Sequence, residues 1–254
     1  MADTALRSRS ISEIVDAAFS LYRRDFLQYF MVGAIAYSPL ILITILTQGL
    51  SGLGASFTVM AMAFGAILAF TLVSGVIARM GSDVYLGGHA NAMDTVSKVL
   101  PRVLALIGAM LVSYLIIGVG FVLLLVPGLY FAIRLCAVPQ TVVLEGKAPM
   151  EAISRSWALT KGRAGHVFGT LLLVYGIFYV LTLGLTLVTA LAGNVVLQTI
   201  INSLIGMFCY PLLTLVSLVL YYDLRIRGEG FDVEHMSQSL GTHGYGAPMG
   251  SPGL

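Results

Sequence analysis

A single arginine inside an apolar stretch is the residue of this chain most suited to binding chemistry. Arg134 lies in the segment YFAIRLCAVPQTVVLEG at 130–146, which also contains Pro139. A guanidinium group holds a phosphate or carboxylate through two parallel hydrogen bonds, which a lysine reproduces poorly. An ionisable side chain at membrane depth is by default a candidate functional group. We therefore predict that Arg134 is a lipid- or anion-binding residue, provided that its segment spans a membrane.

Two positions are open to the Arg134 side chain. It lies roughly 9 Å from the turn at 127–128, in the outer half of the bilayer, because each helical residue adds about 1.5 Å. From there it can extend to the headgroups at little cost. If it faces the bundle, an unpaired charge costs about 3 kcal/mol and needs acceptors, and this inward position is the one that we expect. The acceptors would be the Leu135 carbonyl, freed by Pro139, and the side chains of Asn194, Gln198 and Tyr210.

A second group of cations lies just beyond this segment, at Arg155, Lys161 and Arg163. They belong to a pattern that predicts a short amphipathic helix, which starts at Pro149 and stops at Gly162. Such helices commonly lie in the headgroup plane with Lys and Arg outward. We predict that the three cations bind anionic headgroups. The alternative is that the helix only packs beside the membrane-spanning segments. Structural or interfacial roles are assigned to Trp157, Pro139 and Pro211.

Groups that would support catalysis do not converge in the sequence. The four histidines are scattered, the carboxylates occur singly, and neither a His-Glu-x-x-His pair nor a Gly-rich phosphate loop is present. Cys136 and Cys209 lie in apolar runs, where a buried thiol is the simplest interpretation. We predict no catalytic residue, no metal and no cofactor.

The composition indicates an integral membrane protein. Hydrophobic residues make up 58% of 254 residues and charged residues 10%, and the mean hydropathy is +0.93. The net charge of +2 gives no reason to expect nucleic acid. Since a membrane helix needs about 20 apolar residues, five runs predict spans, and 129–144 is a shorter sixth candidate broken at Pro139. The five runs are 26–48, 57–78, 103–126, 167–191 and 195–222.

The charges predict the topology. Apart from Arg134, every Lys and Arg lies near the N-terminus, at 79–102, at 147–163, or from Arg225 onward, and the connections 49–56, 127–128 and 191–194 carry no charge. The positive-inside rule then places both termini in the cytoplasm, with 129–144 as a real span.

A threefold repeat is also visible. Each basic segment contains an amphipathic pattern before a pair of spans, and Ser10 with Glu13 forms a capping box in the first. We predict an all-α, polytopic membrane bundle of about six transmembrane helices in three hairpins, each preceded by an interfacial helix. The repeat-like units run from about 10–80, 88–146 and 148–227 within one membrane domain at 1–234. Residues 235–254, rich in Gly, Ser and Pro, are predicted to be a disordered cytoplasmic tail.

Three stretches resemble one known family. They are LRSRSISEIVDAAFSLYRRDF near the start, PGLYFAIRLCAVPQTVVLEGKAPMEAISRSWALTKGR at 127–163, and YYDLRIRGEGFD at 221–232. They are similar to the membrane domain of bacterial glycerophosphoryl diester phosphodiesterases and to stand-alone inner-membrane proteins of the same kind. In the fused members this domain precedes a catalytic barrel, and no barrel sequence follows here. The resemblance implies a bacterial inner-membrane protein and does not imply the phosphodiesterase activity.

The function expected from these features is not enzymatic. We expect an inner-membrane scaffold, regulator or lipid-handling module that binds anionic lipids, a membrane protein partner or a second copy of itself. The alternative is a transporter or channel for a small solute or lipid, built from the proline-containing spans around Arg134. A proton or cation path usually needs buried carboxylates, and the predicted spans contain none.

Overall fold

The computed structural model describes residues 7–46, 52–190, 193 and 195–230, and in this part of the chain the protein is helical without strands. Six candidate membrane spans are long and apolar enough to cross a bilayer, which confirms the predicted all-α polytopic bundle. The predicted tail at 235–254 lies outside the described residues. The helices are α1 (Ile11–Arg24), α2 (Phe26–Leu46), α3 (Gly52–Tyr85), α4 (Ala92–Val99), the short 3-10 helix η1 (Leu100–Arg102), α5 (Val103–Leu123), α6 (Leu125–Leu135), α7 (Val138–Glu145), α8 (Pro149–Thr160), α9 (Ala164–Ala190) and α10 (Val195–Glu229).

A short helix is followed by two long ones in α1 to α3 and in α8 to α10. In α4 to α7 the short helix is followed by one long helix, α5, and then by two shorter ones, α6 and α7. The first short helix starts as predicted. The Ser10 hydroxyl accepts from the Glu13 backbone N–H, and the Glu13 carboxylate accepts from the Ser10 N–H. The hydrogen bond from the Ser10 backbone, with help from Arg7, lowers the pKa of Glu13 to about 2. This carboxylate therefore stays charged, as a cap on the positive end of a helix requires.

Helix α10 forms the centre of the protein. It packs against α1, α2, α3, α8 and α9, and its side chains from Leu215 to Leu224 are largely buried. Pro211 lies inside α10 and Pro39 inside α2, yet both helices continue through them. In contrast to α10, α9 is exposed along almost its whole length. Because it is also strongly apolar, α9 is the helix best suited to face lipid hydrocarbon.

The predicted sixth span is two helices joined at a break. It begins earlier than expected, at Leu125, and α6 and α7 meet at Cys136 and Ala137, directly before Pro139. A proline at the first turn of a helix is favourable because its missing N–H would have no partner there. The Ser156 hydroxyl of α8 bridges the break with two hydrogen bonds: it donates to the carbonyl of Arg134 and accepts from the backbone N–H of Ala137. Two backbone groups at the break are thus satisfied within the protein, as a membrane-spanning segment requires.

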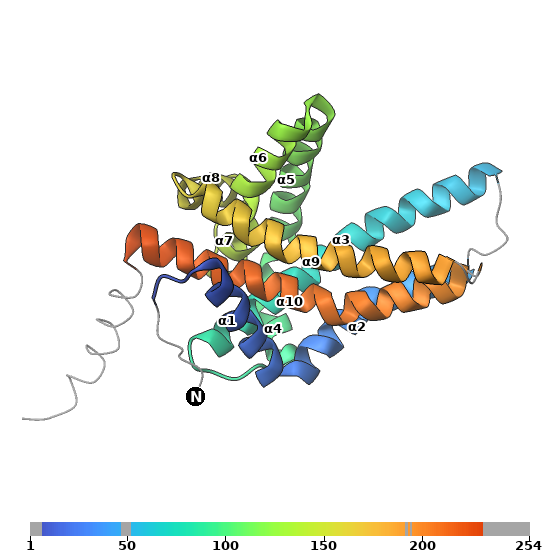
Figure 1. Ribbon diagram of the computed structural model, residues 1–254, viewed down its shortest axis with the longest axis horizontal. Coiled ribbons are helices and arrows are strands. Elements are labelled where there is room, and N and C mark those ends of the chain that lie inside the picture. The colour runs from blue at the N-terminus through green and yellow to red at the C-terminus, as the bar shows by residue number, and fades with distance from the viewer. Residues whose placement is uncertain (1–6, 47–51, 191–192, 194, 231–254) are drawn as a thin grey trace, which may run out of the picture.

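The three hairpins are not parallel. Figure 1 shows the α5–α6 hairpin standing well away from the α9–α10 pair, whose helices run side by side. Helix α7 returns from the α5–α6 hairpin to pack against α3, and α8 then runs back along α7 and α6. The space between these two groups of helices contains a cavity with a mainly apolar lining.

Candidate functional site

Arg134 lies inward, as expected, but its surroundings differ from the prediction. Its side chain is 7% exposed and stacks on two rings, with the guanidinium carbon 4.7 Å from the centroid of Trp157 and 5.5 Å from that of Tyr130. One nitrogen donates to the Thr160 hydroxyl at 3.3 Å. The Trp157 and Thr160 groups both belong to α8, so Arg134 joins α6 to α8.

Among the acceptors predicted from the last span, Tyr210 does not bind Arg134. The hydroxyl of Tyr210 donates to the carbonyl of Phe70, and Asn194 lies outside the described residues. The physical reason is the position of α8. It lies antiparallel along α6 and α7, with Ala152 bonded to Thr141 and Thr160 to Arg134, and so places aromatic rings where the sequence suggested hydrogen-bond acceptors from α10. Helix α8 therefore packs on α6 and α7 with one side buried along its length.

The stacking gives Arg134 a testable structural role. Replacement with lysine keeps the buried charge but removes the planar stacking, so we expect a loss of about 2 kcal/mol in unfolding free energy. Arg134→Leu should cost less, because it removes the charge and still packs on Trp157. Thermal unfolding in mild detergent measures both. The control is Arg23→Lys, since Arg23 is exposed above the Phe19 ring at 5.8 Å, and we expect no change there. Equal stability of Arg134→Lys and the parent protein would contradict the stacking role.

Arg155 lies in an ion-pair cluster rather than facing lipid. Its Nε donates to Glu145 at 2.8 Å, and its terminal nitrogens donate to both oxygens of Glu229 near the end of α10. Tyr221 donates to Glu145 at 2.8 Å. The hydrogen bonds from Arg155 to Glu229, and then those to Glu145, raise the pKa of Arg155 above its ordinary value. We call Glu145, Arg155, Tyr221 and Glu229 the clamp, because they connect α7, α8 and α10.

A second cluster is built around Asp223, which is 1% exposed. Its carboxylate accepts hydrogen bonds from the backbone N–H of Arg9 and, at 2.8 Å, from the side chain of Arg227. It also interacts with His166 at 3.0 Å.

Two of the predicted lipid-binding cations remain. Arg163 donates to the carbonyl of Arg227 at 2.7 Å, whereas Lys161 is exposed. The structure therefore does not bring Arg134, Arg155, Lys161 and Arg163 together into one site. Three of them, Arg134, Arg155 and Arg163, bind to other parts of the protein instead.

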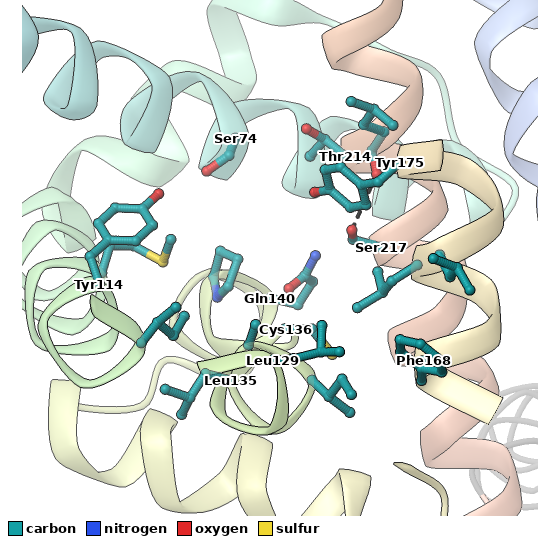
Figure 2. A pocket seen from close by; sticks show the side chains of 18 of the residues that line it. Ser74, Tyr114, Leu129, Leu135, Cys136, Gln140, Phe168, Tyr175, Thr214 and Ser217 are labelled. Carbon is teal, nitrogen blue, oxygen red and sulfur yellow. Dashed lines mark hydrogen bonds between the residues drawn. The ribbon is translucent and has the colours of Figure 1, made fainter. Parts of the chain in front are cut away.

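A cavity of about 460 Å³ lies in the angle between the α5–α6 hairpin and the α9–α10 pair (Figure 2). Residues of α3, α5, α6, α7, α9 and α10 line it, and Pro139 is among them. The described lining residues are mainly apolar and none is charged. Several at the border are substantially exposed, Leu172 by 58% and Tyr175 by 50%, both on the lipid-suited α9. The cavity therefore opens to the outside of the protein beside α9.

Gln140 supplies the most unusual group in this cavity. Its side chain is 1% exposed, and neither its amide oxygen nor its amide nitrogen has a hydrogen-bond partner. Figure 2 shows the amide pointing into the space between Ser74 and Tyr114 on one side and Tyr175 and Ser217 on the other. Sequence reasoning concentrated on Arg134 and missed Gln140. The available signal was an uncharged polar side chain six residues later in the same apolar segment.

No group of three or more His, Cys, Asp or Glu side chains among the described residues is arranged to hold a metal ion. Cys136 and Cys209 are free thiols, and both residues are partly exposed rather than fully buried. The lining of the cavity offers apolar contacts and neutral hydrogen-bonding groups. Comparisons with protein-family models, with curated proteins and with solved structures found no match for this chain.

Proposed function

We propose that this multi-pass membrane protein is a non-enzymatic, lipid-handling module that holds part of a membrane lipid in the lateral cavity. The observation that carries the proposal is the cavity itself: its described lining is mainly apolar and uncharged, and it lies beside α9, which is mostly exposed and strongly apolar. Its size is within the usual range of about 300–1,000 Å³ for ligand pockets, which are typically apolar with a few polar groups.

The route into the cavity supports a lipid rather than an aqueous solute. The border residues Leu129, Leu172 and Tyr175 are all partly exposed, and in a membrane their neighbours would be acyl chains. A molecule that reaches the cavity by this route leaves hydrocarbon and enters an apolar site. It therefore pays little for desolvation of its chain.

The proposal includes a bacterial inner membrane and cytoplasmic termini. The support is the distribution of Lys and Arg and the family resemblance, with the clamp and the Asp223 cluster at the ends of helices that carry this charge. Lys161 and Arg163 remain the proposed contacts with anionic headgroups. Arg155 is better explained by the clamp.

The transporter alternative receives less support. It depends on interrupted helices around Arg134, but α2 and α10 continue through Pro39 and Pro211, and Arg134 is stacked on the rings of Tyr130 and Trp157. A solute path would need polar groups that continue across the membrane. The charged groups described here lie instead in clusters near helix ends.

Filling the cavity tests the proposal. Gly176 lines it, and a Cβ atom added there would meet no atom within 4 Å. Gly176→Phe should therefore fold normally and place its ring in the cavity, and labelling of the cavity by a photoactivatable alkane should fall about tenfold, or about 1.4 kcal/mol of binding. Mass spectrometry of labelled peptides measures the change.

The matched control is Gly184→Phe. Gly184 is on the same helix and is equally open, but it does not line the cavity, so labelling should be unchanged. The proposal fails if the alkane does not label cavity residues in the parent protein. It also fails if both phenylalanine variants behave alike.

A further inference from the structure

We infer that the cavity selects an uncharged, hydroxyl-bearing lipid, of the long-chain alcohol type, whose hydroxyl group is held by Gln140. This inference rests on the proposed function and specifies its ligand. It is carried by the unsatisfied amide of Gln140, together with the hydrogen-bonding state of the hydroxyl groups that face it.

The amide of Gln140 is the group that the cavity leaves incomplete. A buried polar group without a partner costs about 1–3 kcal/mol, and nearly all buried polar groups in proteins have partners. Here both the oxygen and the nitrogen of one side chain lack them. A ligand that supplies one donor and one acceptor would recover this cost, and a hydroxyl group does both with one atom.

The oxygens of the neighbouring hydroxyl groups can also accept a hydrogen bond from a ligand. Thr214 donates its hydrogen to the Tyr210 carbonyl at 3.1 Å, and Ser217 donates to that of Leu213 at 3.2 Å. Ser74 donates to the carbonyl of Thr71 at 2.7 Å. Because each hydrogen is used within its own helix, these oxygens face a ligand as acceptors. An ester or ketone would accept from Gln140 but offer them nothing, whereas an alcohol also donates.

Charged headgroups do not fit this lining. No cation among the described lining residues can pair with a phosphate or carboxylate, and no anion can pair with an ammonium group. The nearest candidate in sequence, Arg134, turns to the opposite side of α6 and stacks on Trp157. An isolated charge in an apolar site is strongly disfavoured, so the ligand's polar end must be neutral.

The position of Gln140 also fits a lipid with one polar end. Gln140 lies five residues before Glu145, which is about 8 Å along a helix. Glu145 belongs to the clamp and is the last residue of α7. The lining also includes Leu172 and Tyr175, whose side chains are substantially exposed. The hydroxyl end would therefore lie near the level of the charged groups, with the chain leaving sideways. The volume equals roughly 15 water-sized groups, which suits one chain better than two.

Three photoactivatable probes of equal length test the inference: a long-chain alcohol, the matched alkane and the matched carboxylate. In the parent protein the alcohol should label cavity residues about tenfold more efficiently than the carboxylate and more than the alkane. Gln140→Met preserves the length of the side chain and removes its hydrogen bonds. It should reduce alcohol labelling about tenfold and leave alkane labelling unchanged.

A stability measurement separates binding from folding. Without ligand, Gln140→Met should unfold at the same temperature as the parent protein or higher, because an unsatisfied amide is replaced by an apolar group. Alkane labelling that Gly176→Phe blocks, without a preference for the alcohol or without an effect of Gln140→Met, would overturn this inference and leave the proposed function standing. Absence of alkane labelling in the parent protein would refute the proposed function itself.

Discussion

Replacement of Gly33 with valine is expected to cost about 3 kcal/mol in unfolding free energy, because it forces α2 away from α10. A Cβ atom at Gly33 would lie 2.7 Å from the backbone oxygen of Met207 and 3.2 Å from Cγ of Pro211. A flexible side chain could move aside, but a helix backbone cannot. The two helices approach closely because this position has no side chain, as is common between membrane helices.

Pro211 explains why the backbone oxygen of Met207 is available for the contact with Gly33. In a regular helix the N–H of residue 211 would donate to the carbonyl of residue 207, and proline has no such hydrogen. The freed oxygen lies against Gly33 on the neighbouring helix. Membrane helices tolerate proline where neighbouring groups cover the freed carbonyl. We therefore assign Pro211 a structural role, and α10 remains a single helix.

The measurement for Gly33→Val is thermal unfolding in detergent, followed by both far-ultraviolet circular dichroism and aggregation. Gly65→Val is the matched control, because Gly65 is exposed on α3 and an added Cβ would meet nothing within 4 Å. The control should differ little from the parent protein. If Gly33→Val and Gly65→Val unfold at the same temperature, the α2–α10 contact does not depend on a small residue. The close approach is then not a major source of stability.

The helices and their order were predictable from the sequence because apolar length and charge distribution are local signals. The run at 26–48 became α2, and 195–222 became the core of α10, which continues to Glu229. The ends were less predictable, since charged residues such as Asp223 can extend a helix when another part of the chain pairs with them. Pro149 correctly marked the start of α8 and Pro139 the break before α7.

The candidate site was much harder to predict because it depends on how the hairpins pack. The sequence singled out Arg134 correctly as buried, but the rings that hold it come from α8, whose orientation no local pattern specifies. The unsatisfied amide of Gln140 is likewise a consequence of the angle between the α5–α6 hairpin and the α9–α10 pair. In a parallel bundle the same residue could have found a partner on a neighbouring helix.

The second large effect is expected at the clamp. Arg155→Gln should cost about 2–3 kcal/mol, because Glu145, whose side chain is 13% exposed, would keep its charge and lose its main partner. The estimate is below the value for fully buried pairs because Arg155 is itself 25% exposed. The pKa of Arg155 is raised by its partners, so its stabilising effect is fully present below the ordinary arginine pKa. The loss should therefore be measurable at neutral pH.

Lys161→Gln is the control for the clamp, since Lys161 is an exposed cation shortly after the same helix. It removes the same charge and should change unfolding by less than about 0.5 kcal/mol. An equal effect of the two variants would indicate a general contribution of positive charge near the membrane surface. It would contradict a specific role of Arg155.

A double-mutant cycle with Glu229→Gln resolves how the clamp acts. If Arg155 holds the end of α10 to α8, the two substitutions share one interaction, and the double variant should cost clearly less than the sum of the single ones. The cavity adds a second consequence, because α7 supplies Gln140 and α10 supplies Ser217 to its lining. Loosening the clamp lets these helices separate, so Arg155→Gln should weaken labelling by the alcohol probe more than labelling by the alkane. Hydrogen bonding to both helices needs a fixed distance between them, whereas apolar contact does not.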